Sequence, residues 1–250
     1  MILVLTYHKV QEAAGRDNGF YTVTRERLEQ QLERLAQRGL EALTPDRLLE
    51  PRTLSSPASL LTFDDGTRGH FEVVLPILAR HARRAIFFVP TAKLDRPGYL
   101  TRQQLREISQ AGHTIGLHSH EHRRLDRMRE PEVREQMRRS KEILGEMSGA
   151  PPVMFAPPGG FINPMVRAIA LEAGVRVIRT MRWGYNEPAE MRALDCIPLN
   201  RYSSEREFEQ VLKCRRRTFL YAAKEMTKKL MPEQGYALLR RALMGLRRRG

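Results

Sequence analysis

The sequence predicts an α/β protein: a distorted (β/α) barrel of about seven parallel strands over residues 1–211, followed by a basic helical extension over 212–250. Short apolar runs alternate with amphipathic stretches, which is typical of βα units and a parallel sheet. Seven or eight such units in about 200 residues favour a closed barrel over an open sheet. The net charge of +14 is uneven, because residues 212–250 hold twelve Lys/Arg against two Asp/Glu.

Seven apolar runs are the expected strands, because each is short and is bounded by polar or turn-forming residues. In chain order they are 2–7, 59–63, 85–89, 113–117, 152–156, 175–180 and 194–199. Amphipathic stretches between them are the expected helices. These are 25–39, a turn of helix from Pro45, 69–81, 101–112, 130–148, 163–173 and 203–217. Thr44 and Thr101 are expected to cap the second and fourth of these helices.

Composition narrows the classes of function. No apolar run approaches the ~20 residues that a membrane span requires. The apolar run at the N-terminus is too short for a signal peptide and lacks its charged flank. Cys196 and Cys214 are isolated and fit no metal-ligand spacing, so two reduced thiols are expected. Together these features predict a cytoplasmic protein.

Chemically distinctive residues follow five of the predicted strands. They are His8, Asp64 with Asp65, the segment "HSHEH" (118–122), "PPGG" (157–160) and "RWGY" (182–185). In a (β/α) barrel the carboxyl ends of all strands open onto one face, where active sites are built. We therefore expect these five segments to converge.

The histidine-rich segment is a candidate metal site. Two imidazoles and a carboxylate, with one open position, can hold a catalytic Zn²⁺ or a similar ion. His118 and His122 share a face if a helical turn begins after the strand. On a continuing strand all three histidines would share a face, so spacing alone does not exclude His120. Asp64 and Asp65 supply one carboxylate ligand and leave a second acid as a base; a solvated surface turn is the less favoured alternative.

Two motifs together resemble the polysaccharide deacetylase domain of carbohydrate esterase family 4, of the nodulation-factor deacetylase type. They are "TFDDG" (62–66) and "H-S-x-x-H" (118–122), and the resemblance covers roughly residues 1–200. It implies that Asp65, His118 and His122 bind a divalent metal, usually Zn²⁺, and that Asp64 is the catalytic base.

A third segment, "FAPPGG" (155–160), resembles the motif that builds the oxyanion hole of this family. The resemblance implies that the backbone N–H of Gly159 faces the oxyanion, with Pro157 and Pro158 beside the substrate. A main-chain donor is indifferent to the side chain, so a glycine is acceptable there. The family's arginine in this motif, which braces the base, is replaced by Ala156.

The late Leu-x-His motif of the family is absent, but "LTYH" (5–8) resembles the first strand of a circularly permuted branch, that of the biofilm poly-N-acetylglucosamine deacetylases. This likeness implies that His8 is the general acid, and the first and last strands of a closed barrel are neighbours. A packing histidine stabilised by Tyr7 is the alternative. Tyr7 and Trp183 are the remaining candidates for substrate contacts. Trp183 either walls the acetyl methyl group or belongs to the core.

The resemblance implies a metal-dependent N-deacetylase that hydrolyses the acetamide of an N-acetylhexosamine, in a glycan or a lipid-linked glycan precursor, and releases acetate. One alternative is a glycan-binding pseudoenzyme, suggested by Ala156 and the missing late histidine. Another is a hydrolase of the same fold that acts on a cyclic amide or ureide. Nucleic-acid binding is disfavoured, because no aromatic stacking platform accompanies the basic residues.

The extension over 212–250 is predicted to form two basic amphipathic helices. Their apolar stripes are Phe219, Ala223, Met226 and Leu230, then Tyr236, Leu239, Leu243 and Leu246. Such helices suit the interface of an anionic membrane, which here would be the inner face of the plasma membrane. The alternative is that the stripes pack on the barrel or on a second subunit.

Overall fold

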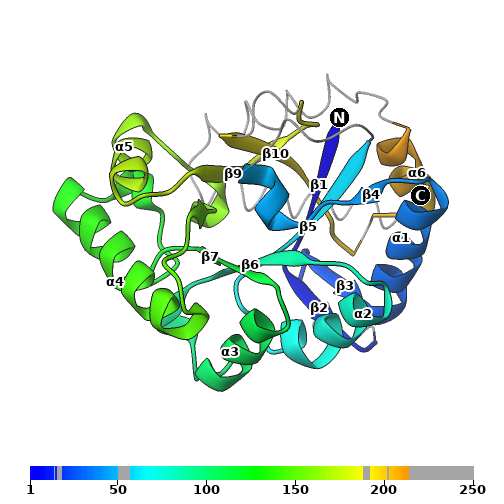
Figure 1. Cartoon of the computed structure of the whole chain (residues 1–250), viewed down its shortest axis with the longest axis horizontal. Helices are drawn as coiled ribbons and strands as arrows, with labels where there is room; N and C mark the ends of the chain where they lie inside the picture. The colour runs from blue at the N-terminus through cyan, green and yellow to red at the C-terminus, as the bar shows by residue number, and fades with distance from the viewer. Residues whose placement is uncertain (14, 16–18, 50–56, 188–191, 202, 214–250) are drawn as a thin grey trace. The chain divides into compact units, whose positions relative to one another are not determined.

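The computed structural model describes residues 1–13, 15, 19–49, 57–187, 192–201 and 203–213. Seven parallel strands close into a barrel, so the predicted fold is confirmed (Figure 1). Around the barrel the strands are β1 (Ile2–Tyr7), β10 (Ala193–Pro198), β9 (Val177–Trp183), β8 (Met154–Phe155), β7 (Thr114–Leu117), β6 (Ala85–Val89) and β5 (Ala58–Asp64), and β5 pairs with β1 again. The short β4 (Glu41–Ala42) also pairs with β5.

Strand β1 is the seam of the barrel. It pairs along its whole length with β5, from Ile2 opposite Ala58 to Tyr7 opposite Phe63, and on its other edge with β10. All six of its residues are buried. His8 and Asp64 are the next positions on the two paired strands, so the register brings them to the same end of the barrel.

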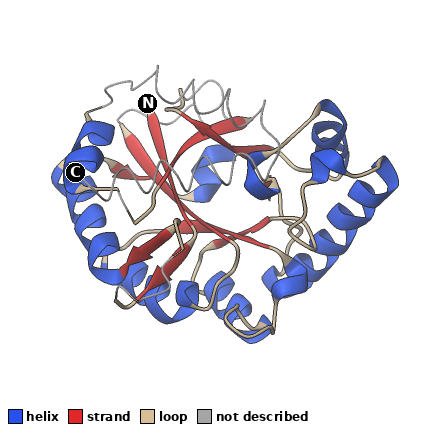
Figure 2. Ribbon diagram, turned by 180° about the vertical axis from the view of Figure 1, so that it is seen from behind, coloured by secondary structure: helices blue, strands red, loops and turns tan. Residues whose placement is uncertain are grey.

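Helices surround the strands (Figures 1 and 2). They are α1 (Arg25–Gln37), α2 (Leu75–Arg80), α3 (Arg102–Gln110), α4 (Glu130–Ser148), α5 (Pro164–Glu172) and α6 (Glu205–Leu212). Thr24, Thr101, Asn163 and Ser204 cap α1, α3, α5 and α6 through their side chains, and such caps satisfy otherwise orphaned helix N–H groups.

Side chains of successive strand residues enter two different cores, because they alternate in direction. One core lies between strands and helices and includes Leu5, Phe63 and Phe87 with Leu28 and Leu32 of α1. The other consists almost entirely of strand residues and fills the barrel, for example Val4, Leu60 and Phe88. Leu48, on the 3₁₀ turn Pro45–Leu49, joins this inner core. The strands are therefore buried on both faces, which explains their continuous apolar runs.

Several local features differ from the sequence-based expectation. A two-stranded parallel ribbon, β2 (Lys9–Gln11) with β3 (Thr22–Thr24), follows β1. The helix expected over 69–81 begins as a π-helical turn, His70–Val74, before α2. Strand β9 runs on to Trp183, because a bulge between its residues 179 and 183 adds residues opposite β10. Three-residue strands and bulges depend on tertiary pairing, so the sequence pattern does not show them.

From residue 214 on, the helical extension predicted over 212–250 lies outside the described residues, and so do its membrane-facing stripes and Cys214. Among the helices that the structure describes, none is both long enough and apolar enough to span a bilayer. The extension stays a prediction.

Candidate metal and acid–base site

Two consecutive aspartates leave the end of β5 in different directions. Asp64 is the last strand residue and is buried, whereas Asp65 has a positive φ of 77°. This left-handed conformation is tolerated by aspartate better than by most residues, and it turns the chain sharply at the strand end. Gly66 continues the turn with a φ of 60°. The turn therefore gives the two carboxylates separate surroundings.

The two outer histidines of "HSHEH" are brought together by a loop and not by the helical turn that their spacing suggested. Ser119 and His122 both have positive φ, 60° and 62°, and the Ser119 hydroxyl accepts a hydrogen bond from the His122 N–H at 3.0 Å. The ring centroids of His118 and His122 lie 4.8 Å apart. The i, i+4 pair therefore forms, but by a different local geometry.

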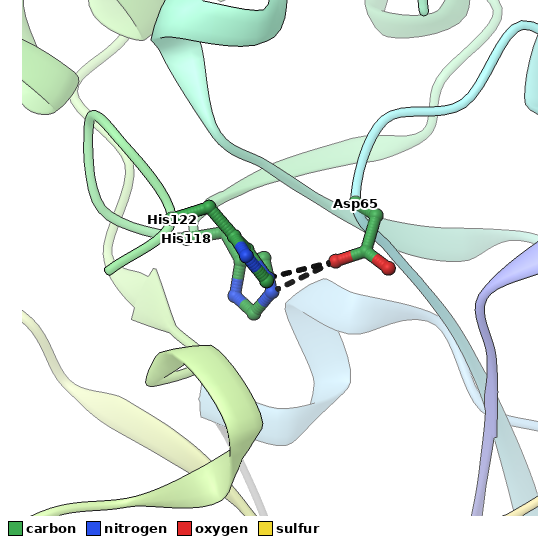
Figure 3. Close-up of side chains that lie close together, drawn as sticks. All are labelled: Asp65, His118 and His122. Carbon is green, nitrogen blue, oxygen red and sulfur yellow. Dashed lines mark ion pairs between the residues drawn. The ribbon is translucent and has the colours of Figure 1, made fainter. Parts of the chain in front are cut away.

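Asp65, His118 and His122 converge on one point (Figure 3). The Asp65 Oδ1 atom lies 3.4 Å from His118 Nε2 and 3.0 Å from His122 Nε2. The Nδ1 of His118 lies 2.6 Å from the carbonyl oxygen of Ala156. Because that nitrogen must donate to a carbonyl, the Nε2 atom of the neutral His118 ring carries the lone pair and faces the carboxylate. A cation between the two groups, either a metal ion or a proton on Nε2, stabilises this arrangement.

The electrostatics of these three side chains agree with a cation site. Burial alone would raise the pKa of the Asp65 carboxyl, but the adjacent imidazoles of His118 and His122 reverse this and hold the pKa well below its usual range. Burial alone would lower the pKa of His118, but the hydrogen bond to Asp65 and the nearby carboxylates raise it. The pocket thus stabilises positive charge. Two imidazoles and one carboxylate fit Zn²⁺ or a similar divalent ion, with Asp65 Oδ1 and the two Nε2 atoms as ligands.

His120, which spacing alone did not exclude, points elsewhere. Its Nδ1 lies 2.7 Å from the hydroxyl of Thr91. The loop around it is anchored by Gln136 of α4, whose amide oxygen accepts hydrogen bonds from the N–H groups of His120 and Glu121 and whose amide nitrogen donates to the Glu121 carboxylate. His120 therefore belongs to the support of the loop and not to the ligand set.

Asp64 forms an ion pair that the sequence did not reveal. Arg179 of β9 donates from Nη2 to Asp64 Oδ2, and both side chains are almost fully buried, at 1% and 2% exposure. Burial alone would lower the pKa of Arg179, but the charge of Asp64 outweighs it and raises that pKa. The guanidinium also lies over the Phe88 ring, 5.2 Å from its centroid. Asp64 Oδ1 is buried and has no hydrogen-bond partner among the described residues.

Arg179 compensates for the missing third-motif arginine. Phe155 of β8 is paired with Ile178 of β9, so Ala156 and Arg179 are the next positions on adjacent strands. Ala156 belongs to the inner core, and its small side chain leaves room for an arginine from the neighbouring strand. Asp64 is therefore held by an arginine although the third motif lacks one. The sequence offered only two arginines, Arg176 and Arg179, in the predicted strand "VRVIRT", and nothing in that pattern distinguished them.

His8 lies where the sequence predicted. Its Nε2 atom is 3.8 Å from Asp64 Oδ2, and its ring stacks on Tyr21 with centroids 4.4 Å apart and planes 15° apart. Burial lowers the pKa of His8, and the nearby carboxylates of Asp64 and Asp65 only partly oppose this shift. The resting protein therefore favours neutral His8.

Of the other predicted site residues, Pro157, Pro158 and Gly159 follow β8, whereas Tyr7 lies on β1. Pro157 and Pro158 are buried, while Gly159 is exposed and has a φ of 65°, which suits glycine at this turn. Its oxyanion role stays a prediction. Tyr7 is fully buried in the outer core, donates to Gln31 of α1 at 3.0 Å and stacks on Phe63. The predicted substrate contact of Tyr7 is therefore corrected, because its side chain faces α1 and not the mouth of the barrel.

Trp183 is partly buried and packs against the outer core, edge-on to Tyr185 at 5.5 Å. This packing agrees with the core alternative. Its contact with an acetyl group stays a prediction.

The sequence model described as polysaccharide deacetylase matches residues 52–178. The match covers just over half of the chain and includes Asp64, Asp65, His118 and His122. The chain therefore belongs to the polysaccharide deacetylase family.

Among curated relatives, YxkH of Bacillus subtilis is 23% identical over 178 residues, which are 70% of this chain and 62% of YxkH. The peptidoglycan-N-acetylglucosamine deacetylase PgdA of Listeria monocytogenes is 31% identical over 141 residues, 54% of this chain and 28% of PgdA. The matches thus span less than two thirds of each relative.

Solved structures share the fold over most of the chain. IcaB from Ammonifex degensii aligns with a TM-score of 0.75 and 26% identity, over 85% of this chain and 95% of IcaB. The deacetylase PplD of Streptococcus pyogenes, in complex with acetate, aligns with a TM-score of 0.76 and 22% identity, over 84% of this chain and 97% of PplD. The second likeness shows the fold alone.

Proposed function

We propose that this protein is a metal-dependent N-deacetylase that hydrolyses the acetamide group of an N-acetylhexosamine unit in a glycan and releases acetate. The observation that carries the proposal is the braced base: Asp64 Oδ2 is held by Arg179, while Oδ1 has no partner among the described residues. A pocket that only bound sugar would gain nothing from a buried, positioned carboxylate beside the three metal ligands. Several relatives are peptidoglycan-N-acetylglucosamine deacetylases, which supports the choice of sugar.

Asp65, His118 and His122 would hold the metal. When bound, such an ion polarises the amide carbonyl and lowers the pKa of bound water. Asp64 Oδ1 is the atom that accepts the proton of the attacking water, because Oδ2 is occupied by Arg179. A base placed in this way contributes about 10²–10⁴-fold to the rate.

His8 is placed to protonate the leaving amine. Because the resting histidine favours its neutral form, it must gain a proton during the reaction. Asp64, whose Oδ2 atom lies 3.8 Å from His8 Nε2, is the source of that proton, which a solvent molecule relays because this distance exceeds that of a direct hydrogen bond. One proton thus passes from water to Asp64, to His8 and to the amine nitrogen, which leaves as the free amino sugar. The N–H of Gly159 is assigned to the oxyanion.

An assay of acetate release tests the proposal. The purified protein is loaded with Zn²⁺, Co²⁺ or Ni²⁺ and given N-acetylglucosamine oligomers of increasing length. We expect release that disappears with a chelator, and a loss of about 10²–10⁴-fold for Asp64→Asn with the metal still bound. Asp95→Asn, the same change at an exposed aspartate that pairs with Arg102, is the matched control. Metal binding without acetate release from any oligomer would point to a binding protein.

A finer proposal concerns where the substrate is presented. The basic stripes predicted over 212–250 would hold the protein at an anionic membrane, where lipid-linked glycan precursors are found. Co-sedimentation with phosphatidylglycerol vesicles should occur for the whole chain, weaken at high salt and vanish without 214–250, while acetate release from a soluble oligomer persists. Salt-independent sedimentation, or loss of folding on truncation, would contradict the membrane role.

A further inference from the structure

His70 is a buried histidine that the proposed reaction does not use. It is the first residue of the π-helical turn His70–Val74 and is fully buried. Its ring packs against Phe63 and Phe87, with centroids 5.6 Å and 5.7 Å away. A phenylalanine would suit such surroundings, so the nitrogen atoms need a separate reason.

One of those nitrogens contacts the candidate general acid. His70 Nε2 lies 2.5 Å from the backbone carbonyl oxygen of His8. Because a carbonyl only accepts, Nε2 carries the hydrogen and donates it. The other nitrogen, Nδ1, is buried and has no hydrogen-bond partner in the described part of the chain. The neutral ring is therefore held in one tautomer by the contact with His8. Burial lowers the pKa of His70 to about 4, which keeps this donor neutral under ordinary conditions.

The residue before His70 touches the same segment. A Cβ atom placed on Gly69 would lie 1.9 Å from the carbonyl oxygen of Val10, so the two backbones are in direct contact. The π-helical turn therefore meets the stretch 8–10 at two points, the carbonyl of His8 and the carbonyl of Val10. Its local structure fits this role, since π-helical turns are frequent at functional sites.

His8 needs such support because the barrel no longer holds it. The pairing of β1 with β5 ends at Tyr7 opposite Phe63, one residue before His8. Catalytic histidines are often oriented by a hydrogen bond at the nitrogen that does not react. Within the described residues, His8 Nδ1 is buried without such a partner. The stack on Tyr21 fixes the plane of the ring, so its position along that plane depends on the main chain.

We propose that His70 is a positioning residue for the general acid: its Nε2–H anchors the backbone of His8 so that the imidazole faces Asp64 and the leaving amine. This inference rests on the proposed function, because it assumes that His8 protonates the amine. In this inference the π-helical turn His70–Val74 helps to set the distance between Asp64 and His8.

The test compares two substrates that differ in their need for an acid. An N-acetylglucosamine oligomer loses a poor leaving group that must be protonated, whereas 4-nitrophenyl acetate loses a stable phenolate. His70→Phe keeps the packing and removes the donor. We expect kcat on the oligomer to fall about tenfold to a hundredfold, as for a modest misplacement of a catalytic group. The KM for the oligomer, the kcat on the ester and the bound metal should stay unchanged.

His70→Gln restores an N–H at a similar reach and should recover most of the amide activity. His113→Phe is the matched control, because His113 is also buried, also contacts Phe87, and has a pKa lowered to about 4 by burial. It binds the N–H of Ala85 instead, at the start of β6. This control should not change the ratio of amide to ester activity. His70→Leu serves in the same assay if His70→Phe does not fold.

A double-variant cycle that combines changes at His8 and His70 tests the same inference with the oligomer as the single substrate. If His70 acts through His8, then His8→Ala/His70→Phe hydrolyses the oligomer no more slowly than His8→Ala. Additive losses, equal losses on amide and ester, or full amide activity in His70→Phe would each overturn the inference. Failure of the proposed function looks different: wild-type protein without amide activity, or His8→Ala with full amide activity, would remove the acid itself.

Discussion

The site is built from two regions of the chain that differ in how they can be recognised. Residues 52–178, which match the polysaccharide deacetylase family, carry Asp64, the proposed base, and Asp65, His118 and His122, the proposed metal ligands. The two groups that flank the base come from outside that segment: His8 follows β1, and Arg179 lies on β9, one residue beyond the match. The region that matches the family carries the sequence motifs, and the residues outside it supply the two side chains that flank Asp64.

This contrast reflects what each group needs from the fold. The metal ligands must meet at one point, so both their identities and the turns that aim them are constrained. A partner for Asp64 must only place a guanidinium or an imidazole beside a carboxylate at the mouth of a closed barrel. Neighbouring strands offer equivalent positions for that purpose, as Ala156 and Arg179 on β8 and β9 illustrate. We therefore expect that a partner of Asp64 can come from either strand, whereas each of the three candidate ligands depends on its own turn.

The largest expected effect is on the metal ligands. His118→Ala or His122→Ala should abolish stoichiometric metal binding and with it acetate release, because each removes one of three protein ligands. His120→Ala, which loses only the contact with Thr91, should keep one metal ion per chain. Metal content of the dialysed proteins, measured by elemental analysis, decides this, and an empty site in His120→Ala alone would refute the ligand assignment.

The next prediction tests whether the arginine that pairs with Asp64 can be moved from β9 to the adjacent β8. Arg179→Ala leaves the buried charge of Asp64 unpaired, so we expect the free energy of unfolding to fall by about 3–5 kcal/mol. Ala156→Arg/Arg179→Ala places the arginine on the adjacent strand and should recover much of this stability and of kcat. Denaturant titration and acetate release measure the two recoveries. If the double variant is no better than Arg179→Ala, the positions are not interchangeable and the comparison above fails.

A smaller effect concerns support of the ligands within the first region. Gln136→Leu removes three hydrogen bonds from the loop at residues 120–121. Groups that orient metal ligands typically contribute about tenfold to a hundredfold in affinity, so we expect metal binding to weaken by that factor while the fold is retained. Competition with a chromophoric chelator measures the affinity. Gln110→Leu, at the end of α3, is the control, and equal weakening in both variants would argue against a specific role of Gln136.

The sequence predicted the barrel and the convergence of Asp65, His118 and His122 because both leave strong local patterns. Continuous apolar runs mark strands buried on two faces, and "TFDDG" with "HSHEH" marks the ligands. Arg179 left no such pattern, since its inward direction depends on the pairing of β8 with β9. The contact of His70 with His8 joins residues that are 62 positions apart. Tyr7 was misassigned because alternation along β1 sends it to the outer core, while its neighbour His8 lies beyond the strand.

The seam at β1 also bears on how the chain folds. This strand precedes the other barrel strands in the chain, yet one of its edges pairs with β5 and the other with β10, the last strand of the barrel. Until residues 193–198 are available, the edge of β1 that pairs with β10 stays unpaired, and an unpaired apolar edge can associate with other chains. Contacts this distant in sequence make closure a slow, late step. Trp183 is paired with Cys196 on β10 and is the only tryptophan, so its fluorescence during refolding should report the moment at which the barrel closes.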